Sequence, residues 1–152
     1  MHVVARTTTH RRKAFLPTAL LLLAVVIGCG KTTAPDRQPA IRAAGTWQWV
    51  ESLNVRTAEV STPSSAGFTA TLTLVAESGS SGTFTYLRSG APPIAGHYQI
   101  SFEDEEGNDF ITVEPGFDFL TRYAWIAVGT DSLRLNGVFE LGYNSTYARV
   151  SD

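Results

Sequence analysis

The feature that most constrains the fold of this chain is an alternation of apolar and polar residues between turn-forming clusters. The clearest example is the segment 68–76, where apolar residues at the even positions from 68 to 74 alternate with threonines at 69, 71 and 73. A period of two places successive side chains on opposite faces of a strand, whereas a helix needs a period of 3.6. The segment is therefore predicted to be a half-buried strand.

About eight segments of this kind follow one another from residue 45 onward, and clusters of Gly, Pro, Ser, Asn and Asp separate them. They cover residues 45–53, 68–76, 83–88, 94–102, 110–114, 119–128, 132–139 and 142–150. No segment has a helical period. Short turns favour antiparallel pairing between sequential strands, and closure removes the exposed edges that a flat sheet presents. We therefore expect an all-β domain, an eight-stranded antiparallel up-and-down barrel, over residues 45–152.

The first 28 residues are expected to be a targeting segment and not part of this domain. Residues 1–13 hold four basic and no acidic residues, and residues 14–27 are uncharged. A basic start followed by a short apolar stretch is typical of a secretion signal. Fourteen residues rise only about 21 Å as a helix, whereas a bilayer core is about 30 Å thick, so a permanent membrane span is the weaker interpretation.

The apolar stretch ends at Val26-Ile27-Gly28-Cys29, which resembles the lipobox of bacterial lipoproteins. The resemblance implies attachment of a diacylglycerol to the sulfur of Cys29, cleavage after Gly28, and often acylation of the new amine. The alternative is a chance Gly-Cys pair after an ordinary signal. Because Cys29 is the only cysteine, no disulfide can form within the chain. Two or more acyl chains anchor a protein stably, so a membrane is the expected partner.

These features divide the chain into a lipoprotein signal peptide (1–28), a lipidated N-terminus with a flexible linker (29–44) and the barrel domain (45–152). Gly30 follows the cysteine. In bacteria with two membranes an Asp at that position resembles the inner-membrane retention signal. Its absence predicts an outer-membrane location, or the outer face of the plasma membrane if the cell has one membrane.

The charge of the mature chain is strongly acidic. From Cys29 onward 8 basic residues stand against 14 acidic ones, and from Gly45 onward 5 stand against 13, which gives net charges of −6 and −8. Such a domain repels polyphosphates, which argues against nucleic-acid binding and against electrostatic docking on anionic lipid. The acyl chains are therefore expected to hold the protein at the membrane.

Several motifs follow one another in a specific order along the domain. They are Gly45-Thr46-Trp47, Thr62-Pro63-Ser64-Ser65, Gly82-Thr83-Phe84-Thr85-Tyr86, Gly96-His97-Tyr98-Gln99-Ile100, Asp131-Ser132-Leu133-Arg134-Leu135 and Tyr147-Ala148-Arg149. The first resembles the Gly-x-Trp signature of lipocalins. The ordered set, which spans most of residues 45–150, is similar to the small lipocalin-like lipoproteins of environmental bacteria. The loops at 76–82 and 136–137 depart from that family, whose members often have a cysteine pair or a tight Asp-Gly turn there.

The resemblance implies that Trp47 packs across one end of the barrel beneath Arg149 of the last strand. An indole face attracts a guanidinium group by about 0.5 to 2 kcal/mol, which gives this pair a physical reason. Trp47 and Arg149 are therefore expected to close the structure and not to bind a ligand.

The residues needed for catalysis or for metal binding are scarce. His97 is the only histidine after the signal, it falls on the expected solvent face, and no serine lies in a Gly-x-Ser-x-Gly elbow. We therefore expect neither an enzyme nor a metal or other cofactor. The acidic run 103–109 could hold a calcium ion, but it lacks the spacing of an EF-hand loop and is interpreted as a solvated turn.

Aromatic residues of the predicted strands could line a cavity. With Phe68 as a further candidate, the expected ligand-binding residues are Phe84, Tyr86, Tyr98, Phe102, Tyr123 and Trp125. Eight-stranded barrels either fill their interior with side chains or hold one small ligand. The leading hypothesis is a membrane-tethered barrel that binds a small apolar or amphipathic molecule in the cell envelope. The alternative is a structural or interaction lipoprotein whose filled barrel presents an acidic surface to a partner.

Overall fold

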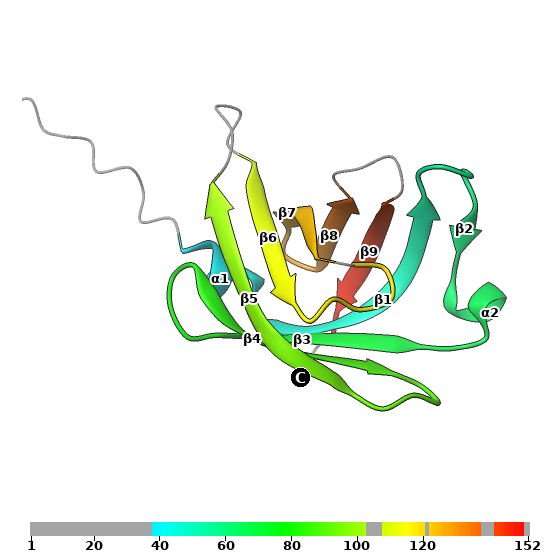
Figure 1. The fold of residues 1–152 in the computed structure, drawn as a ribbon, viewed down its shortest axis with the longest axis horizontal. Coiled ribbons are helices and arrows are strands. Elements are labelled where there is room, and N and C mark those ends of the chain that lie inside the picture. Colours follow the sequence, from blue (N-terminus) through cyan, green and yellow to red (C-terminus); the bar gives the residue numbers. More distant parts are fainter. Residues whose placement is uncertain (1–37, 103–107, 121, 138–141, 151–152) are drawn as a thin grey trace, which may run out of the picture. The chain divides into compact units, whose positions relative to one another are not determined.

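The computed structural model describes residues 38–102, 108–120, 122–137 and 142–150, which form nine strands and two short helices (Figure 1). In chain order these are α1 (Pro39–Ala43), β1 (Gly45–Asn54), β2 (Val60–Ser61), α2 (Pro63–Ala66), β3 (Ala70–Ala76), β4 (Ser81–Arg88), β5 (Ile94–Phe102), β6 (Asp109–Glu114), β7 (Tyr123–Val128), β8 (Ser132–Gly137) and β9 (Tyr143–Arg149). The predicted signal, Cys29 and most of the linker lie outside the described residues. None of the helices in the described ranges combines the length and apolar character needed to cross a bilayer.

Eight of the strands close into a barrel. The sheet runs β1-β3-β4-β5-β6-β7-β8-β9 with antiparallel neighbours, and β1 also pairs with β9. The two-residue strand β2 pairs with the end of β1, where Ser61 lies opposite Ser52. This topology confirms the predicted eight-stranded antiparallel up-and-down barrel, in which every long strand has two neighbours and leaves no long edge exposed.

The core consists of the side chains that alternate toward the inside of the barrel. In β3, for example, Ala70, Leu72 and Leu74 are at most 2% exposed, and the threonines between them are partly exposed. In β1 the alternation changes phase at a bulge between Trp49 and Glu51. The bulge leaves Val50 and Glu51 both on the surface and brings Ser52 inside the barrel, because one extra residue shifts every later side chain to the other face.

The helix α1 packs on the end of the barrel at which β1 begins and β9 ends, here called the closed end. Ala40 and Ala43 are fully buried there. The indole nitrogen of Trp47 donates a hydrogen bond of 2.9 Å to the carbonyl of Ala43. The prediction of a flexible linker up to residue 44 is therefore wrong for residues 39–43. Five residues are too few to reveal a helical period, although Pro39 stands at a position that suits the start of a helix.

The guanidinium group of Arg149 lies over the ring of Trp47. Its central carbon lies 4.1 Å from the ring centre, and its nitrogens donate to the carbonyls of Ala44 at 3.2 Å and Thr130 at 2.9 Å. Gly45 has a φ of 142°, and a Cβ atom there would lie 2.5 Å from Nη1 of Arg149. The positive φ favours glycine at this position, and the missing side chain also leaves room for the guanidinium group. Trp47 therefore packs beneath Arg149, as expected from the sequence.

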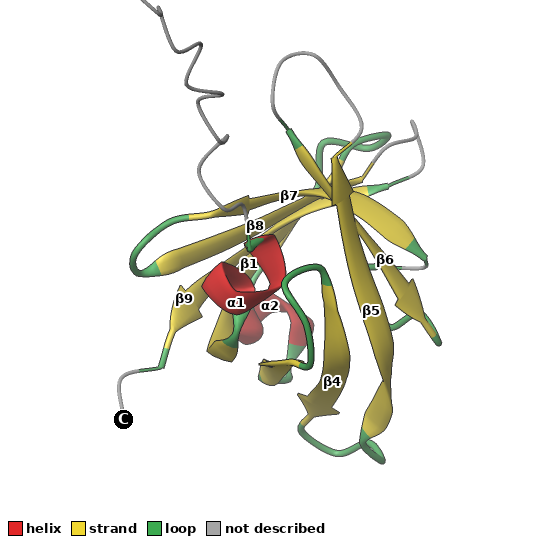
Figure 2. Ribbon diagram, turned by 90° about the vertical axis from the view of Figure 1, so that its left-hand side faces the viewer, coloured by secondary structure: helices red, strands yellow, loops and turns green. Residues whose placement is uncertain are grey.

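Two strands begin later than predicted, and a second helix was not expected. β3 begins at Ala70 and not at residue 68, and β7 begins at Tyr123 and not at 119. Before β7, the backbone amides and carbonyls of Phe117 and Leu120 bond reciprocally at 2.7 and 2.8 Å and so form a turn. The helix α2 is one turn long and is held by a capping box between Thr62 and Ser65. Figures 1 and 2 place α1 and α2 on opposite sides of the barrel.

The closed end provides a first prediction. Replacing Arg149 with alanine removes a stacking interaction and two hydrogen bonds, so the free energy of unfolding should fall by about 1–3 kcal/mol. Urea denaturation measures the change. Arg134→Ala serves as the control, because Arg134 is exposed on β8 and its loss should change the stability by less than about 0.5 kcal/mol. Equal losses in both variants would show that the stacked guanidinium group does not hold the closed end.

Candidate functional site

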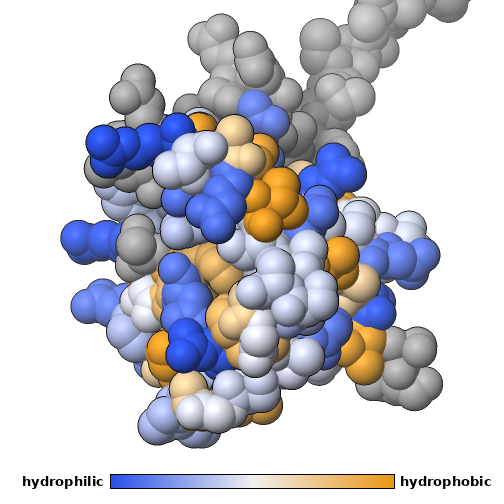
Figure 3. Space-filling view, turned by 90° about the vertical axis from the view of Figure 1, so that its right-hand side faces the viewer, coloured by the Kyte–Doolittle hydropathy of each residue, from blue (hydrophilic) through white to orange (hydrophobic). Residues whose placement is uncertain are grey.

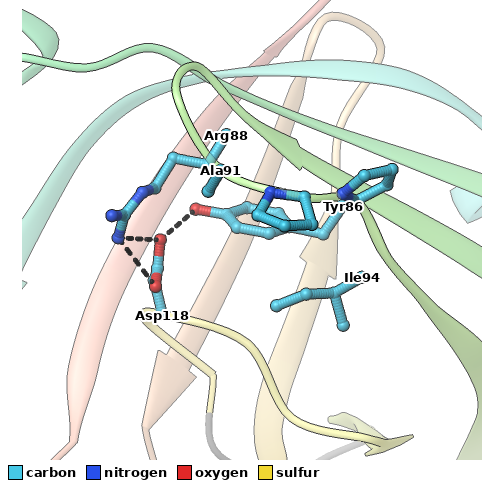
Figure 4. A pocket seen from close by; sticks show the side chains of 7 residues that line it. Tyr86, Arg88, Ala91, Ile94 and Asp118 are labelled. Carbon is cyan, nitrogen blue, oxygen red and sulfur yellow. Dashed lines mark hydrogen bonds and ion pairs between the residues drawn. The ribbon is translucent and has the colours of Figure 1, made fainter.

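The candidate site lies at the opposite end of the barrel, here called the mouth, where β4 ends and β5 begins. A hollow of about 350 Å³, the mouth pocket, opens there and is shown in Figure 4; it is lined by Tyr86, Arg88, Ala91, Pro92, Pro93, Ile94 and Asp118. A second hollow of about 460 Å³ is lined by Ile94, Gly116, Phe117 and Asp118. The two hollows share Ile94 and Asp118, so they flank the same pair of residues.

The polar wall of the mouth pocket is a cluster around the carboxylate of Asp118. The hydroxyl of Tyr86 donates to Oδ2 at 3.1 Å, and Nη1 of Arg88 donates to both carboxylate oxygens at 3.2 Å, as Figure 4 shows. The Arg88 guanidinium also lies 4.7 Å from the ring centre of Phe68. The ion pair is partly exposed, with side-chain exposures of 40% and 28%, so solvent screens it and it orients the site more than it stabilises the fold.

Residues Phe117–Leu120 form a turn across the mouth, here called the mouth turn. Phe117 stacks on Tyr86 with the ring centres 4.5 Å apart, and Phe119 stacks on Trp49 at 4.7 Å. Phe117 and Leu120 are 5% and 3% exposed. The turn therefore joins the β4 side of the barrel to the β1 side and covers the core between them. Figure 3 faces this end, where apolar patches alternate with hydrophilic ones.

Several polar groups lie buried beneath the mouth turn. The indole nitrogen of Trp49 donates to Ser52 at 2.9 Å, and the Ser52 hydroxyl lies 2.7 Å from that of Ser145. The hydroxyl of Tyr147 is fully buried and has no hydrogen-bond partner among the described residues, and the same holds for Nε of Arg88. A buried unpaired donor is costly, so these two groups mark the mouth as a place where a further polar group would be stabilised.

Burial also controls the protonation of the inward-facing tyrosines. It is the main factor that raises the pKa of Tyr147 and of Tyr86 far above the ordinary value of 10, and the charge of Asp118 adds to both shifts. Burial, with a smaller contribution from Glu77, raises the pKa of Tyr98 to about 12. All three hydroxyls are therefore protonated at neutral pH, and those of Tyr86 and Tyr98 donate to Asp118 and to the carbonyl of Ala40.

The predicted ligand-binding residues do not converge on one cavity. Tyr86 lines the mouth pocket, whereas Phe84 and Tyr98 are 2% exposed and pack in the core. Tyr123 and Trp125 do not line the interior of the barrel. These two face outward, because the residues that alternate with them in β7, Ala124 and Ile126, are the buried ones. The side chain of Phe102 lies outside the described residues, and Phe68 stacks on Trp49 at 5.2 Å.

The sequence interpretation missed Arg88, Asp118 and Tyr147 as site residues. The position of Arg88 could have been predicted, since it stands two residues after Tyr86 and therefore at an inward-facing position of the same strand. A charged side chain in that register is expected at the rim of a barrel with a partner of opposite charge. Asp118 gave no such signal, because its position depends on the mouth turn, which does not follow from alternation.

Metal ligands are not gathered at the mouth. Within the described ranges no three residues of the types His, Cys, Asp or Glu are close enough together to hold an ion. His97 is exposed on the outer face of β5. The acidic segment 103–107 lies outside the described residues.

The tyrosines predict a dependence of stability on alkaline pH. A tyrosine whose pKa is higher in the folded state than in the unfolded state makes its full contribution to stability below pH 10. This contribution is lost as the pH rises toward the folded-state pKa. The unfolding free energy should therefore be constant between about pH 7 and 9.5 and fall above pH 10. Tyr98→Phe should make this fall shallower between pH 10 and 12, and urea titrations measure both slopes. Identical slopes in the two proteins would contradict the assignment to Tyr98.

Comparison with protein-family models, curated proteins and solved structures finds no match to this chain.

Proposed function

We propose that this chain is a membrane-anchored lipoprotein whose barrel holds a small amphipathic molecule in the mouth pocket, within the cell envelope. The observation that carries the proposal is the pairing of an apolar wall with a polar wall in one hollow. Pro92, Pro93 and Ile94 form the apolar wall, and Asp118 and Arg88 form the polar one. Ligand pockets are typically concave, largely apolar and supplied with a few oriented polar groups, and about 350 Å³ is within their usual size.

The chemistry of the pocket favours a neutral ligand with one polar group. Arg88 and Asp118 neutralise each other, so neither an anion nor a cation gains a free counterion. The Nε of Arg88, which has no hydrogen-bond partner among the described residues, is able to donate a hydrogen bond. A hydroxyl or carbonyl group of the ligand would be directed to this side, and its apolar part would lie against the two prolines and Ile94.

The anchor would leave the barrel at the end opposite this pocket. Gln38 precedes α1, which packs at the closed end. Eight residues separate Cys29 from Gln38, a span of at most about 30 Å when extended. With Gly30 after the lipidated cysteine, the proposed location is the outer membrane of a cell with two membranes, or the outer face of a single plasma membrane.

A second candidate function is a structural or interaction lipoprotein with a filled barrel and an acidic partner-binding surface. It is favoured by the packed core, in which large side chains such as Trp47, Tyr98 and Tyr147 are at most 2% exposed. The net charge of −8 from Gly45 onward would attract a basic partner. In this case the mouth pocket would stay empty of ligand.

Ligand binding is tested on the protein expressed from Gly30 onward. Native mass spectrometry should find a retained small molecule, and the neutral fluorescent ketone 6-propionyl-2-(dimethylamino)naphthalene should bind with micromolar affinity. Ile94→Trp fills the pocket and Asp118→Ala removes the polar wall, so each should weaken binding about tenfold. Glu59→Gln on the exposed loop before β2 is the control and should change nothing. A bare mass together with no binding of the ketone would favour the second candidate function.

Lipidation is tested with the full chain in a bacterial host. The mature protein should begin at Cys29, carry the mass of two or three acyl chains, and partition into detergent, since such chains anchor a protein stably. Cys29→Ser should remove the acyl mass and release the domain into the aqueous phase without changing its unfolding midpoint. A soluble wild-type protein without added mass would refute the proposed anchor.

A further inference from the structure

The outer wall of the barrel carries two rows of uncharged residues, here called the uncharged wall. Strand register places the members of each row side by side across four strands. The first row is Ser81, Gln99, Thr112 and Tyr123, and the second is Ser101, Phe110, Trp125 and Asn136. All eight alternate with inward-facing residues and therefore point away from the core. The result is one continuous surface over β4 to β8 that none of the mouth residues touches.

Three aromatic rings form the centre of this wall. Phe110 meets Trp125 edge to face with ring centres 5.1 Å apart, and it meets Tyr123 nearly parallel at 5.7 Å. All three residues are partly exposed. Because they lie on the face opposite Ile111, Ala124 and Ile126, the barrel core cannot bury them further. The rings hold one another in place, so they form a preorganised apolar platform edged by hydroxyl and amide groups.

A polar groove of about 300 Å³ runs beside this platform. Ser81, His97, Gln99, Thr112 and Glu114 line it together with Tyr98 and Val113. Gln99 and Thr112 belong to both the groove and the uncharged wall, and Thr112 lies opposite Tyr123 in the register of β6 and β7. The hydrogen-bonding groups of the groove therefore adjoin the aromatic rings directly.

The uncharged wall carries none of the net charge of the domain. From Gly45 onward the chain has 5 basic and 13 acidic residues, yet none of the eight wall residues is charged. Among the described residues, its charged or titratable neighbours include His97 and Glu114, opposite each other on β5 and β6, and Arg134, opposite Ala127. Glu77 is another, since its backbone amide donates to the carbonyl of Ser81. The acidic domain would repel a polyanion, and a surface without charged pairs offers little to a charged peptide.

We propose that the uncharged wall binds a neutral polysaccharide chain. The C–H faces of sugar rings stack on aromatic rings, and their hydroxyls pair with hydroxyl and amide side chains in both donor and acceptor roles. Trp125 and Phe110 supply the stacking platform, and Thr112, Gln99 and Asn136 supply hydrogen bonds on either side of it. The groove then takes the next sugar unit of the chain. This site is independent of the mouth pocket, because the two share no residue.

The three tryptophans make binding directly observable. Trp47 and Trp49 are 0% and 1% exposed, whereas Trp125 is partly exposed, so acrylamide should quench chiefly the fluorescence of Trp125. The neutral probes are the hexasaccharides of N-acetylglucosamine, cellulose, xylan and amylose, each tested up to millimolar concentration. Hexagalacturonate is the anionic control, and vesicles of phosphatidylcholine test for a lipid surface. At least one neutral hexasaccharide is expected to lower the quenching constant about twofold with submillimolar affinity.

Variants locate the bound sugar. Thr112→Ala and Asn136→Ala retain all three tryptophans and should weaken the protection of Trp125 about fivefold, which corresponds to about 1 kcal/mol for one lost hydrogen bond. Ile94→Ala in the mouth pocket is the matched control and should leave the protection unchanged. Equal unfolding midpoints in urea verify that each variant is folded.

Three results would overturn the proposal. The first is the absence of protection by every neutral hexasaccharide at millimolar concentration. The second is protection by hexagalacturonate or by the vesicles alone, which would make the wall an anion or lipid surface. The third is an equal loss of protection in Ile94→Ala, which would place the sugar at the mouth.

Discussion

The seam between β1 and β9 is the constraint on which the rest of the structure depends, because it joins the first and last strands of the barrel. Trp47 lies directly opposite Arg149 across this seam. The guanidinium group stacks on the indole ring, and the indole nitrogen donates a hydrogen bond to α1. One residue thus connects the N-terminal helix, the first strand and the last strand. Without this contact, the seam would lose the side chain that joins these three elements.

At the mouth the end of the barrel is covered by a turn and not by a helix. The mouth turn inserts Phe117 and Leu120 into the core and places Asp118 outside it, between Tyr86 and Arg88. The aromatic contacts of Phe117 and Phe119 fix the position of the carboxylate, so the polar wall of the pocket depends on apolar packing. This coupling explains why polar residues from β4 and from the loop after β6 meet although they are 30 and 32 positions apart in the chain.

The sequence predicted the fold more fully than the site, and the difference has a physical reason. Alternation with a period of two is a local property, so it located all eight barrel strands and the inward position of Tyr86. The helix α1 and the mouth turn are too short to have a period, and both are stabilised by contacts with distant strands. Asp118 and Tyr147 acquire their significance only from those contacts. Tyr123 and Trp125 are a different case, since their aromatic character alone suggested an interior cavity, whereas the register of Ala124 and Ile126 places them on the outside of the barrel.

The alternation of inward and outward side chains also limits where such a barrel can bind another molecule. Inward positions are occupied by large side chains such as Trp47, Phe84 and Tyr147, which are at most 2% exposed, so a ligand meets the molecule at its rim or on its outer wall. The rim has an ion pair beside an apolar hollow. The outer wall has aromatic rings that the alternation of side chains along each strand keeps out of the core. Because these rings are partly exposed, part of their hydrophobic surface stays in contact with water. Because the barrel is closed and its core is packed, these rings cannot be buried inside it. Only a molecule bound from outside can remove water from their surface.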